Sequence, residues 1–176
     1  MDRRRNHQSK DNLRTSASGG AGGLLTKEQG LPKLRQYCAY QERSHSEVVQ
    51  KLWDIGVRRA HHDEIISSLI EDDYLNEERF AVQFAGGKFR VKGWGRKKIA
   101  YALKERGVST YNINKALKEI AEVDYQKTLQ HFASKKWNEL KGEQHLIRKK
   151  KCTDYLLQKG YESELVSQAL AQCTNR

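Results

Sequence analysis

The sequence contains a single proline, Pro32, among 176 residues, and it has few runs of β-branched side chains. Sheet proteins are rich in β-branched residues, so their scarcity here favours an all-α protein. Apolar residues make up only 37% of the chain, and no apolar run approaches the length of a membrane span. The composition therefore predicts small helical modules with modest cores and no membrane association.

Cysteine is also scarce, and the three cysteines lie far apart without a CxxC pair: Cys38, Cys152 and Cys173. All three occur among apolar helical positions, which predicts small buried side chains in a reducing compartment. The basic start, Met1–Arg5, is not followed by the apolar stretch of a secretory signal. We therefore expect a cytoplasmic protein.

The motifs of common catalytic and cofactor sites are missing. No serine or cysteine stands in a recognisable nucleophile motif. The glycines of Gly93–Lys98 fit neither a Walker A loop nor a dinucleotide fingerprint. The adjacent pair His61 and His62 is poorly placed for chelation, and we predict a solvated helix start there. The sequence thus predicts a binding protein with no enzymatic activity, cofactor or metal.

Positive charge is concentrated in one segment. The formal net charge of the chain is +11. Residues 34–72 carry five basic and seven acidic side chains, a net charge of −2. Residues 86–106 carry eight basic side chains and one acidic, a net charge of +7. Such a cluster indicates a polyanion or an acidic protein surface as partner, although a solvated helix face is the plain alternative.

A leucine–glycine motif occurs three times at nearly constant spacing. Leu52–Val57 recurs as Leu103–Val108 and as Leu156–Tyr161, at offsets of 51 and 53 residues. Apolar residues at helical spacing precede and follow each copy. The pattern predicts an all-α fold of three tandem three-helix repeats that form an elongated, curved array.

The predicted boundaries follow from this periodicity and from the polar, glycine-rich start of the chain. We expect residues 1–23 to be a disordered basic tail, since they contain too few apolar side chains to form a core. The repeats are then residues 24–72, 73–121 and 122–176.

Several helix ends can be read from the sequence. Ser44 and Glu47 form a capping box, and Gly56 and Gly107 suit the left-handed position after a helix. Asn76 is expected to cap the helix that begins at Glu77, and Asp124 a helix that begins at Tyr125.

The basic segment offers the best candidate binding site. Gly93 and Gly95 should end one helix, so that Arg96, Lys97 and Lys98 fall in the first turn of the next. Cations at a helix N-terminus oppose the helix dipole by about 0.3–1 kcal/mol each, so their presence indicates a gain elsewhere. With free N–H groups they would clamp phosphate or carboxylate. The predicted contact set is Lys88, Arg90, Lys92, Trp94, Arg96, Lys97 and Lys98.

Two roles stay open for Trp94. It either stacks on a base or fills a partner's pocket, or it covers the junction between two repeats. A secondary basic patch is predicted at Arg148, Lys149, Lys150 and Lys151, with a solvated helix face as the default interpretation. Five aromatic residues at helical spacing are expected in the core: Phe80, Phe84, Tyr125, Phe132 and Trp137.

Three segments of the second repeat resemble the central repeat of the RecX family, bacterial regulators of the RecA recombinase. They are Tyr74–Ala81, Lys92–Ile99 and Leu103–Val108. The resemblance extends from about Leu34 to Cys173. It implies a monomeric inhibitor that lodges in the groove of the RecA–single-stranded DNA filament and limits filament extension, ATP hydrolysis and strand exchange in recombination and the SOS response.

The resemblance further implies contact with single-stranded DNA, either directly or through the filament. The alternative is a stand-alone DNA-binding protein that reads duplex grooves with helix–turn–helix-like repeats. The third helices of the repeats, near Ile65–Ile70, Ile113–Ile120 and Leu165–Leu170, are poor in base-reading side chains, which disfavours that alternative.

The predicted boundaries can be tested on the intact chain. Limited proteolysis is expected to remove residues 1–23 and to leave the remainder intact, because only the remainder has helical apolar periodicity. Circular dichroism of the trimmed protein should be predominantly helical. A substantial β signal would contradict the fold assignment.

Overall fold

The computed structural model describes residues 24–174; the expected disordered tail, residues 1–23, lies outside the described part. That part is helical apart from its turns and one isolated β-bridge between Leu25 and Val57. The helices are α1 Lys27–Tyr40, α2 His45–Asp54, η1 Arg59–His61, α3 His62–Glu71, α4 Glu77–Lys92, α5 Arg96–Lys104, α6 Thr110–Lys118, α7 Glu122–Glu139, α8 His145–Gln158 and α9 Ser163–Thr174.

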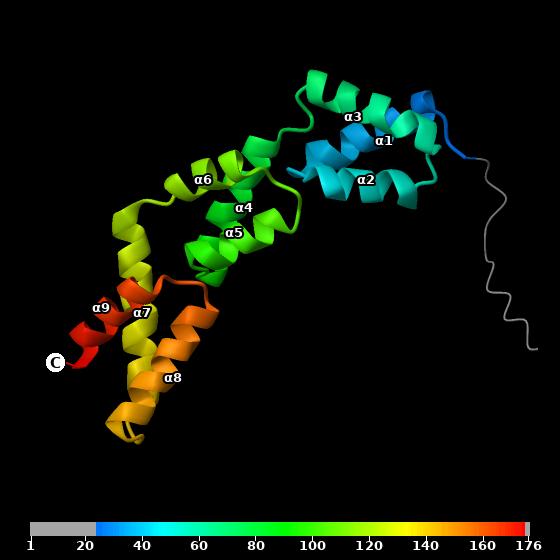
Figure 1. Ribbon diagram of the computed structural model, residues 1–176. Helices are drawn as coiled ribbons and strands as arrows, with labels where there is room; N and C mark the ends of the chain where they lie inside the picture. Colours follow the sequence, from blue (N-terminus) through cyan, green and yellow to red (C-terminus); the bar gives the residue numbers. More distant parts are fainter. Residues whose placement is uncertain (1–23, 175–176) are drawn as a thin grey trace, which may run out of the picture.

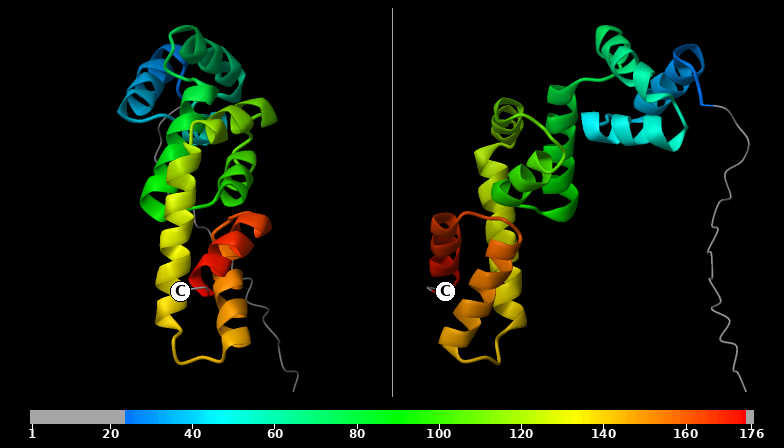
Figure 2. Two further views of the ribbon diagram at one scale, coloured as in Figure 1. Left: turned by 90° about the vertical axis from the view of Figure 1, so that its left-hand side faces the viewer. Right: turned by 45° about the vertical axis from the view of Figure 1, so that its right-hand side comes forward.

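Three groups of three α-helices follow one another along a bent line, α1–α3, α4–α6 and α7–α9 (Figures 1 and 2). The prediction of an all-α array of three tandem three-helix repeats is confirmed. In each group, the first and third helices pack against each other, and the middle helix contacts both. We call the three groups repeats 1, 2 and 3.

Local sequence signals account for most helix ends. The Ser44 side chain accepts from the backbone N–H of Glu47 at 3.2 Å, and the Glu47 carboxylate accepts from the Ser44 N–H at 2.8 Å. Asn76 caps α4 by accepting from the N–H of Arg79 at 3.0 Å. The expected Asp124 cap is wrong, because α7 begins at Glu122, three residues before the expected start at Tyr125, and places Asp124 in its first turn.

The repeat glycines have the expected backbone conformation. Gly56, Gly107 and Gly160 have φ of 74°, 77° and 92°, a left-handed region that side chains disfavour. In each repeat the following residue, Val57, Val108 or Tyr161, donates its N–H back to the motif leucine at 3.0–3.2 Å. The motif therefore ends the second helix of each repeat and turns the chain toward the third.

Buried apolar side chains form two separate cores. One core belongs to repeat 1 and is centred on Leu34, Leu52 and Leu69, with Leu75 from the connection to repeat 2 added. The other core runs without a break through repeats 2 and 3, where Tyr125 and Tyr161 are completely buried. Repeats 2 and 3 are thus one packed unit, and repeat 1 is packed mainly within itself.

The junction between repeats 2 and 3 brings two backbones into contact. A Cβ on Gly95 would lie 2.3 Å from the carbonyl carbon of Gly160, and a Cβ on Gly160 would lie 2.3 Å from the Cβ of Lys98. Gly93 faces the ring of Phe132 just as closely. Only glycine allows this approach, and the close contact is what lets the two repeats share a core.

The corresponding junction between repeats 1 and 2 is looser and depends on side chains. Ser46 donates its hydroxyl to the carbonyl of Arg106 at 3.2 Å, and Arg79 bridges Glu42 of repeat 1 and Asp73 of the connection. Gly107, which follows Arg106, has nothing within 4 Å of an added Cβ. Equivalent glycines therefore serve different purposes at the two junctions.

Two expectations for single residues are modified. His62 is buried, not solvated: its Nε2 lies 3.1 Å from the Val57 carbonyl oxygen, and its ring meets the edge of Trp53. Cys38 and Cys152 are buried as expected, and Cys173 is half-buried.

The contrast between the two glycines gives a stability prediction. Gly107→Ala should lower the free energy of unfolding by about 1 kcal/mol, because only the left-handed conformation is penalised. Gly160→Ala should cost roughly 3 kcal/mol or more, because its Cβ also overlaps the Lys98 backbone and forces the repeats apart. Urea unfolding of the full chain measures both. Equal costs would show that the glycine contact does not hold the junction.

Candidate nucleic-acid interface

The N-terminus of α5 is capped by repeat 3. The Gly95 N–H donates to the Lys159 carbonyl at 2.8 Å, the Arg96 N–H to the Tyr125 hydroxyl at 3.0 Å, and the Lys97 N–H to the Gly160 carbonyl at 3.0 Å. No side chain of its own caps α5. The expectation of free N–H groups that clamp an anion is therefore wrong, since these three groups are already satisfied by the junction.

Two of the three cations in the first turn of α5 lie at the C-terminal ends of other helices. Arg96 donates to the Ile120 carbonyl beyond the end of α6 at 3.3 Å, and Lys98 donates to the Gln158 carbonyl at the end of α8 at 3.3 Å. Helix C-termini carry partial negative charge, which favours cations. This contact compensates the unfavourable position that these cations have in α5 itself.

Arg96 is held further by side chains of α7. It pairs with Glu122 at 2.8 Å, and its guanidinium lies 4.0 Å from the centre of the Tyr125 ring. The hydrogen bond from Arg96 holds the pKa of the Glu122 carboxyl below its usual range, and burial raises the pKa of the Tyr125 hydroxyl. Arg96 is therefore part of the junction, whereas Lys97 is exposed.

Trp94 has features of both predicted roles, that of a residue that covers the junction and that of a residue that contacts a partner. The ring is half-buried and packs against the shared core of repeats 2 and 3. The amines of Lys88 and Lys98 lie over it, 5.3 Å and 4.9 Å from a ring centre. These contacts place Lys88, Trp94 and Lys98 together on one side of the junction.

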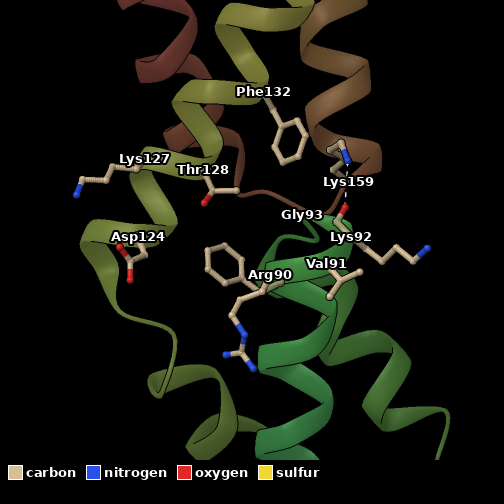
Figure 3. Close-up of a pocket in the computed structure, with 10 residues that line it drawn as sticks. Arg90, Val91, Lys92, Gly93, Asp124, Lys127, Thr128, Phe132 and Lys159 are labelled. Carbon is tan, nitrogen blue, oxygen red and sulfur yellow. Dashed lines mark hydrogen bonds between the residues drawn. The ribbon is translucent and has the colours of Figure 1, made fainter.

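Arg90 and Lys92 belong to a different group of cations. They line a groove of about 600 Å³ between the C-terminal end of α4 and α7, together with Lys127, Lys159 and one carboxylate, Asp124 (Figure 3). In Figure 3, the side chains of Arg90, Lys92 and Lys127 project in different directions around this groove, and Phe132 forms part of its wall. We call it the basic groove.

Lys159 connects the two groups of cations. Its Nζ donates to the Lys92 carbonyl at 3.3 Å and lies 4.1 Å from the centre of the Phe132 ring. Burial lowers the pKa of Lys159, and the nearby charges of Lys98 and Lys135 lower it further. The positive side chains on both sides of the junction are thus close enough to repel one another.

Sequence reasoning missed Lys127 and Lys159. Lys127 is a single lysine in a helix of alternating polar and apolar residues, and no motif around it in the sequence indicates a binding site. Lys159 does precede the third repeat glycine directly, so the repeat register placed it at a helix end. The repeat register did not predict that the helix end at Lys159 contacts the start of α5.

Some of the cations are neutralised by a carboxylate, and others are not. Arg96, Lys115, Lys136 and Lys151 each pair with a carboxylate within 4 Å. Within residues 24–174, the exposed cations around the junction that have no such pair include Arg90, Lys92, Lys97 and Lys127. These four side chains are available to a polyanion.

The four cations of the secondary basic patch also divide into those held by contacts within the protein and those that are free. Arg148 donates to the Trp137 carbonyl at 2.8 Å and lies over the Trp137 ring, so it contributes to packing. Lys151 pairs with Glu143. Only Lys149 and Lys150 are exposed without a carboxylate partner among the described residues.

Residues 24–174 contain no group of three or more His, Cys, Asp or Glu side chains placed to hold a metal ion. No helix of that part combines the length and apolar character needed to cross a membrane.

The fold and this surface define a class of protein, a three-repeat helical array with a positively charged junction. Sequence models of the second and third three-helix domains of RecX match residues 76–117 and 122–170, together more than half of the chain. The chain belongs to the RecX family.

Relatives with the same description confirm the assignment. The chain is 27% identical to the regulatory protein RecX of Oceanobacillus iheyensis over 136 residues, which cover 77% of this chain and 50% of the relative. It is 28% identical to that of Chlorobium phaeobacteroides over 132 residues, which cover 75% of this chain and 85% of the relative. The chain thus spans about half the length of the Oceanobacillus protein.

Solved structures show the same fold. The crystal structure of RecX from Lactobacillus salivarius superposes with a TM-score of 0.77 at 21% identity, over 85% of this chain and 97% of that chain. A second crystal structure of a regulatory protein RecX gives a TM-score of 0.75 at 19% identity, over 81% of this chain and 72% of that one.

The division between structural and free cations predicts opposite effects of neutralising neighbours in α5. Arg96→Gln should lower the free energy of unfolding by about 1–2 kcal/mol, because it removes the bonds to Ile120 and Glu122 and the contact with the Tyr125 ring. Lys97→Gln should change it by less than about 0.5 kcal/mol, with a slight gain from relief of the helix dipole. Urea unfolding measures both. An Arg96→Gln protein as stable as the parent would contradict the structural role of Arg96.

Proposed function

We propose that this protein regulates the RecA recombinase by binding, without catalytic chemistry of its own, and that it inhibits RecA. It acts as a monomer in the cytoplasm, during homologous recombination and the SOS response. It lodges in the groove of the RecA–single-stranded DNA filament and limits filament extension, ATP hydrolysis and strand exchange. Membership of the RecX family supports the link to RecA.

One observation supports the proposed contact surface. Arg90, Lys92, Lys97 and Lys127 are exposed on repeats 2 and 3, which share one core, and have no carboxylate partner within residues 24–174. Since the tight junction fixes their relative positions, they meet phosphates without a large cost of ordering the backbone. Lys88, Trp94 and Lys98 extend the same positive surface on the other side of the junction. Arg96 supports the surface from within and does not touch the partner.

The test is a variant in which four free cations become glutamine, namely Arg90→Gln, Lys92→Gln, Lys97→Gln and Lys127→Gln. Its affinity for RecA–single-stranded DNA filaments should fall roughly 10- to 100-fold, and inhibition of ATP hydrolysis should weaken in parallel. The salt slope of binding should fall by about 0.7 for each lost phosphate contact. Cosedimentation and an ATPase assay measure these effects.

A control with equal loss of charge is available away from the junction. Four exposed cations outside the surface are replaced in the same way, Lys33→Gln, Arg58→Gln, Lys118→Gln and Lys141→Gln. This control should retain affinity within about twofold, because it changes net charge but not the junction surface. If the two variants lose affinity equally, the contact surface is wrong. If naked single- or double-stranded DNA binds as tightly as filaments do, the protein is a stand-alone DNA-binding protein.

A further inference from the structure

Repeat 3 carries a second groove, between α7 and α9, which adjoins the basic groove at Lys127. It has a volume of about 240 Å³. Four of the twelve glutamines of the chain line it, two from each helix: Gln126, Gln130, Gln168 and Gln172. Glutamines on exposed helix faces are common, but here two pairs from different helices face one groove. We call it the glutamine groove.

The two pairs have the same spacing. Gln126 and Gln130 are four residues apart on α7, and Gln168 and Gln172 are four residues apart on α9. Residues four apart lie on one helix face, about 6 Å along the axis. Leu129, Leu165 and Ala169 line the groove between these polar walls. The groove therefore has amide groups along both sides and an apolar floor.

The amide groups retain free hydrogen-bonding capacity. Gln126 donates to Glu122 at 3.0 Å, and Gln130 donates to the sulfur of Cys173 at 3.3 Å, which leaves the side-chain oxygens of both as acceptors. Gln168 and Gln172 are exposed, and neither makes a side-chain hydrogen bond within the described part of the chain. The α7 wall thus offers acceptors, and the α9 wall offers donors and acceptors.

An extended peptide fits this pattern of groups. Its N–H and C=O groups repeat every two residues, about 6.4–6.8 Å, which is close to the spacing of each glutamine pair. A carboxamide can bond to both backbone groups, and the floor accommodates one branched apolar side chain. Lys127 also lines the groove and has no carboxylate partner within residues 24–174, so it favours an acidic residue in the peptide.

Nucleic acid suits the groove less well. Single strands bind through phosphate contacts together with bases stacked on aromatic rings. The glutamine groove has no aromatic residue in its lining and only one cation. We propose that the groove between α7 and α9 binds an extended peptide segment of a protein partner, with a branched apolar side chain close to an acidic residue. This site shares Lys127 with the basic groove and is otherwise formed by different residues.

The binding test uses the full chain and a defined peptide, with neither RecA nor DNA present. The probe is the acetylated and amidated peptide Thr-Val-Thr-Leu-Thr-Asp-Glu, and the control peptide has serine in place of leucine. Nuclear magnetic resonance of the ¹⁵N-labelled protein should show saturable shifts of the side-chain amides of the four glutamines, with a Kd roughly between 0.1 and 1 mM. The serine peptide should bind at least about fivefold more weakly.

A double variant, Gln168→Ala with Gln172→Ala, tests the residues. These side chains are exposed and alanine favours helix, so the protein should stay folded, which circular dichroism checks. Its affinity for the probe should fall at least about fivefold. The matched control, Gln36→Ala with Gln158→Ala, removes two exposed glutamines elsewhere and should bind the probe as the parent does.

Several outcomes would overturn the proposal. They are the absence of saturable shifts at about ten times the expected Kd, unchanged affinity of the Gln168 and Gln172 variant, and shifts of the same resonances by oligothymidylate while the peptide has no effect. The last outcome would make the groove a nucleic-acid site. None of these results bears on RecA regulation, which is measured separately with filaments.

Discussion

The structure depends on the contact between the start of α5 and the end of α8. α5 has glycine where α2, α4 and α6 have a capping side chain, and three of its first N–H groups bond to Tyr125, Lys159 and Gly160 of the next repeat. The partial positive charge of one helix start meets the partial negative charge of another helix end. Because Gly95 and Gly160 lack side chains, the backbones come close enough for repeats 2 and 3 to share one core.

This contact also explains a cluster of charge that is unfavourable when α5 is considered alone. Arg96 and Lys98 stand at a helix N-terminus, yet their side chains reach carbonyl groups that end α6 and α8. The unfavourable energy of these cations at the start of α5 is offset by their favourable positions at the C-terminal ends of α6 and α8. The cations without such a role, among them Arg90, Lys92 and Lys127, surround the same junction. The surface offered to a polyanion is thus organised by the contacts that join the repeats.

The sequence predicted what depends on local chemistry. The repeat glycines, the Ser44 capping box and the Asn76 cap are short-range signals, and they gave the three-repeat array. Contacts between repeats join residues as little as 26 and as much as 68 positions apart, such as Arg96 with Glu122 and Tyr161 with Gly93, and no local pattern encodes them. For that reason Arg96 appeared free, and Lys127, Lys159 and the two pairs of facing glutamines were not connected to any site. His62 shows a different limit, since the turn at Val57 and the ring of Trp53, only five and nine positions before it, lie against its ring.

The two junctions differ in one respect that bears on how the array works. The start of α2 is capped by its own Ser44 and Glu47, so it needs nothing from repeat 2 and touches it through the Ser46 hydroxyl. The start of α5 has no cap of its own and needs repeat 3. Separating repeats 2 and 3 would leave N–H groups without partners, whereas separating repeats 1 and 2 would break mainly exposed or half-buried polar contacts. The second junction is therefore the more closely packed of the two, and the basic groove, built from α4, α7 and the end of α8, lies at that junction.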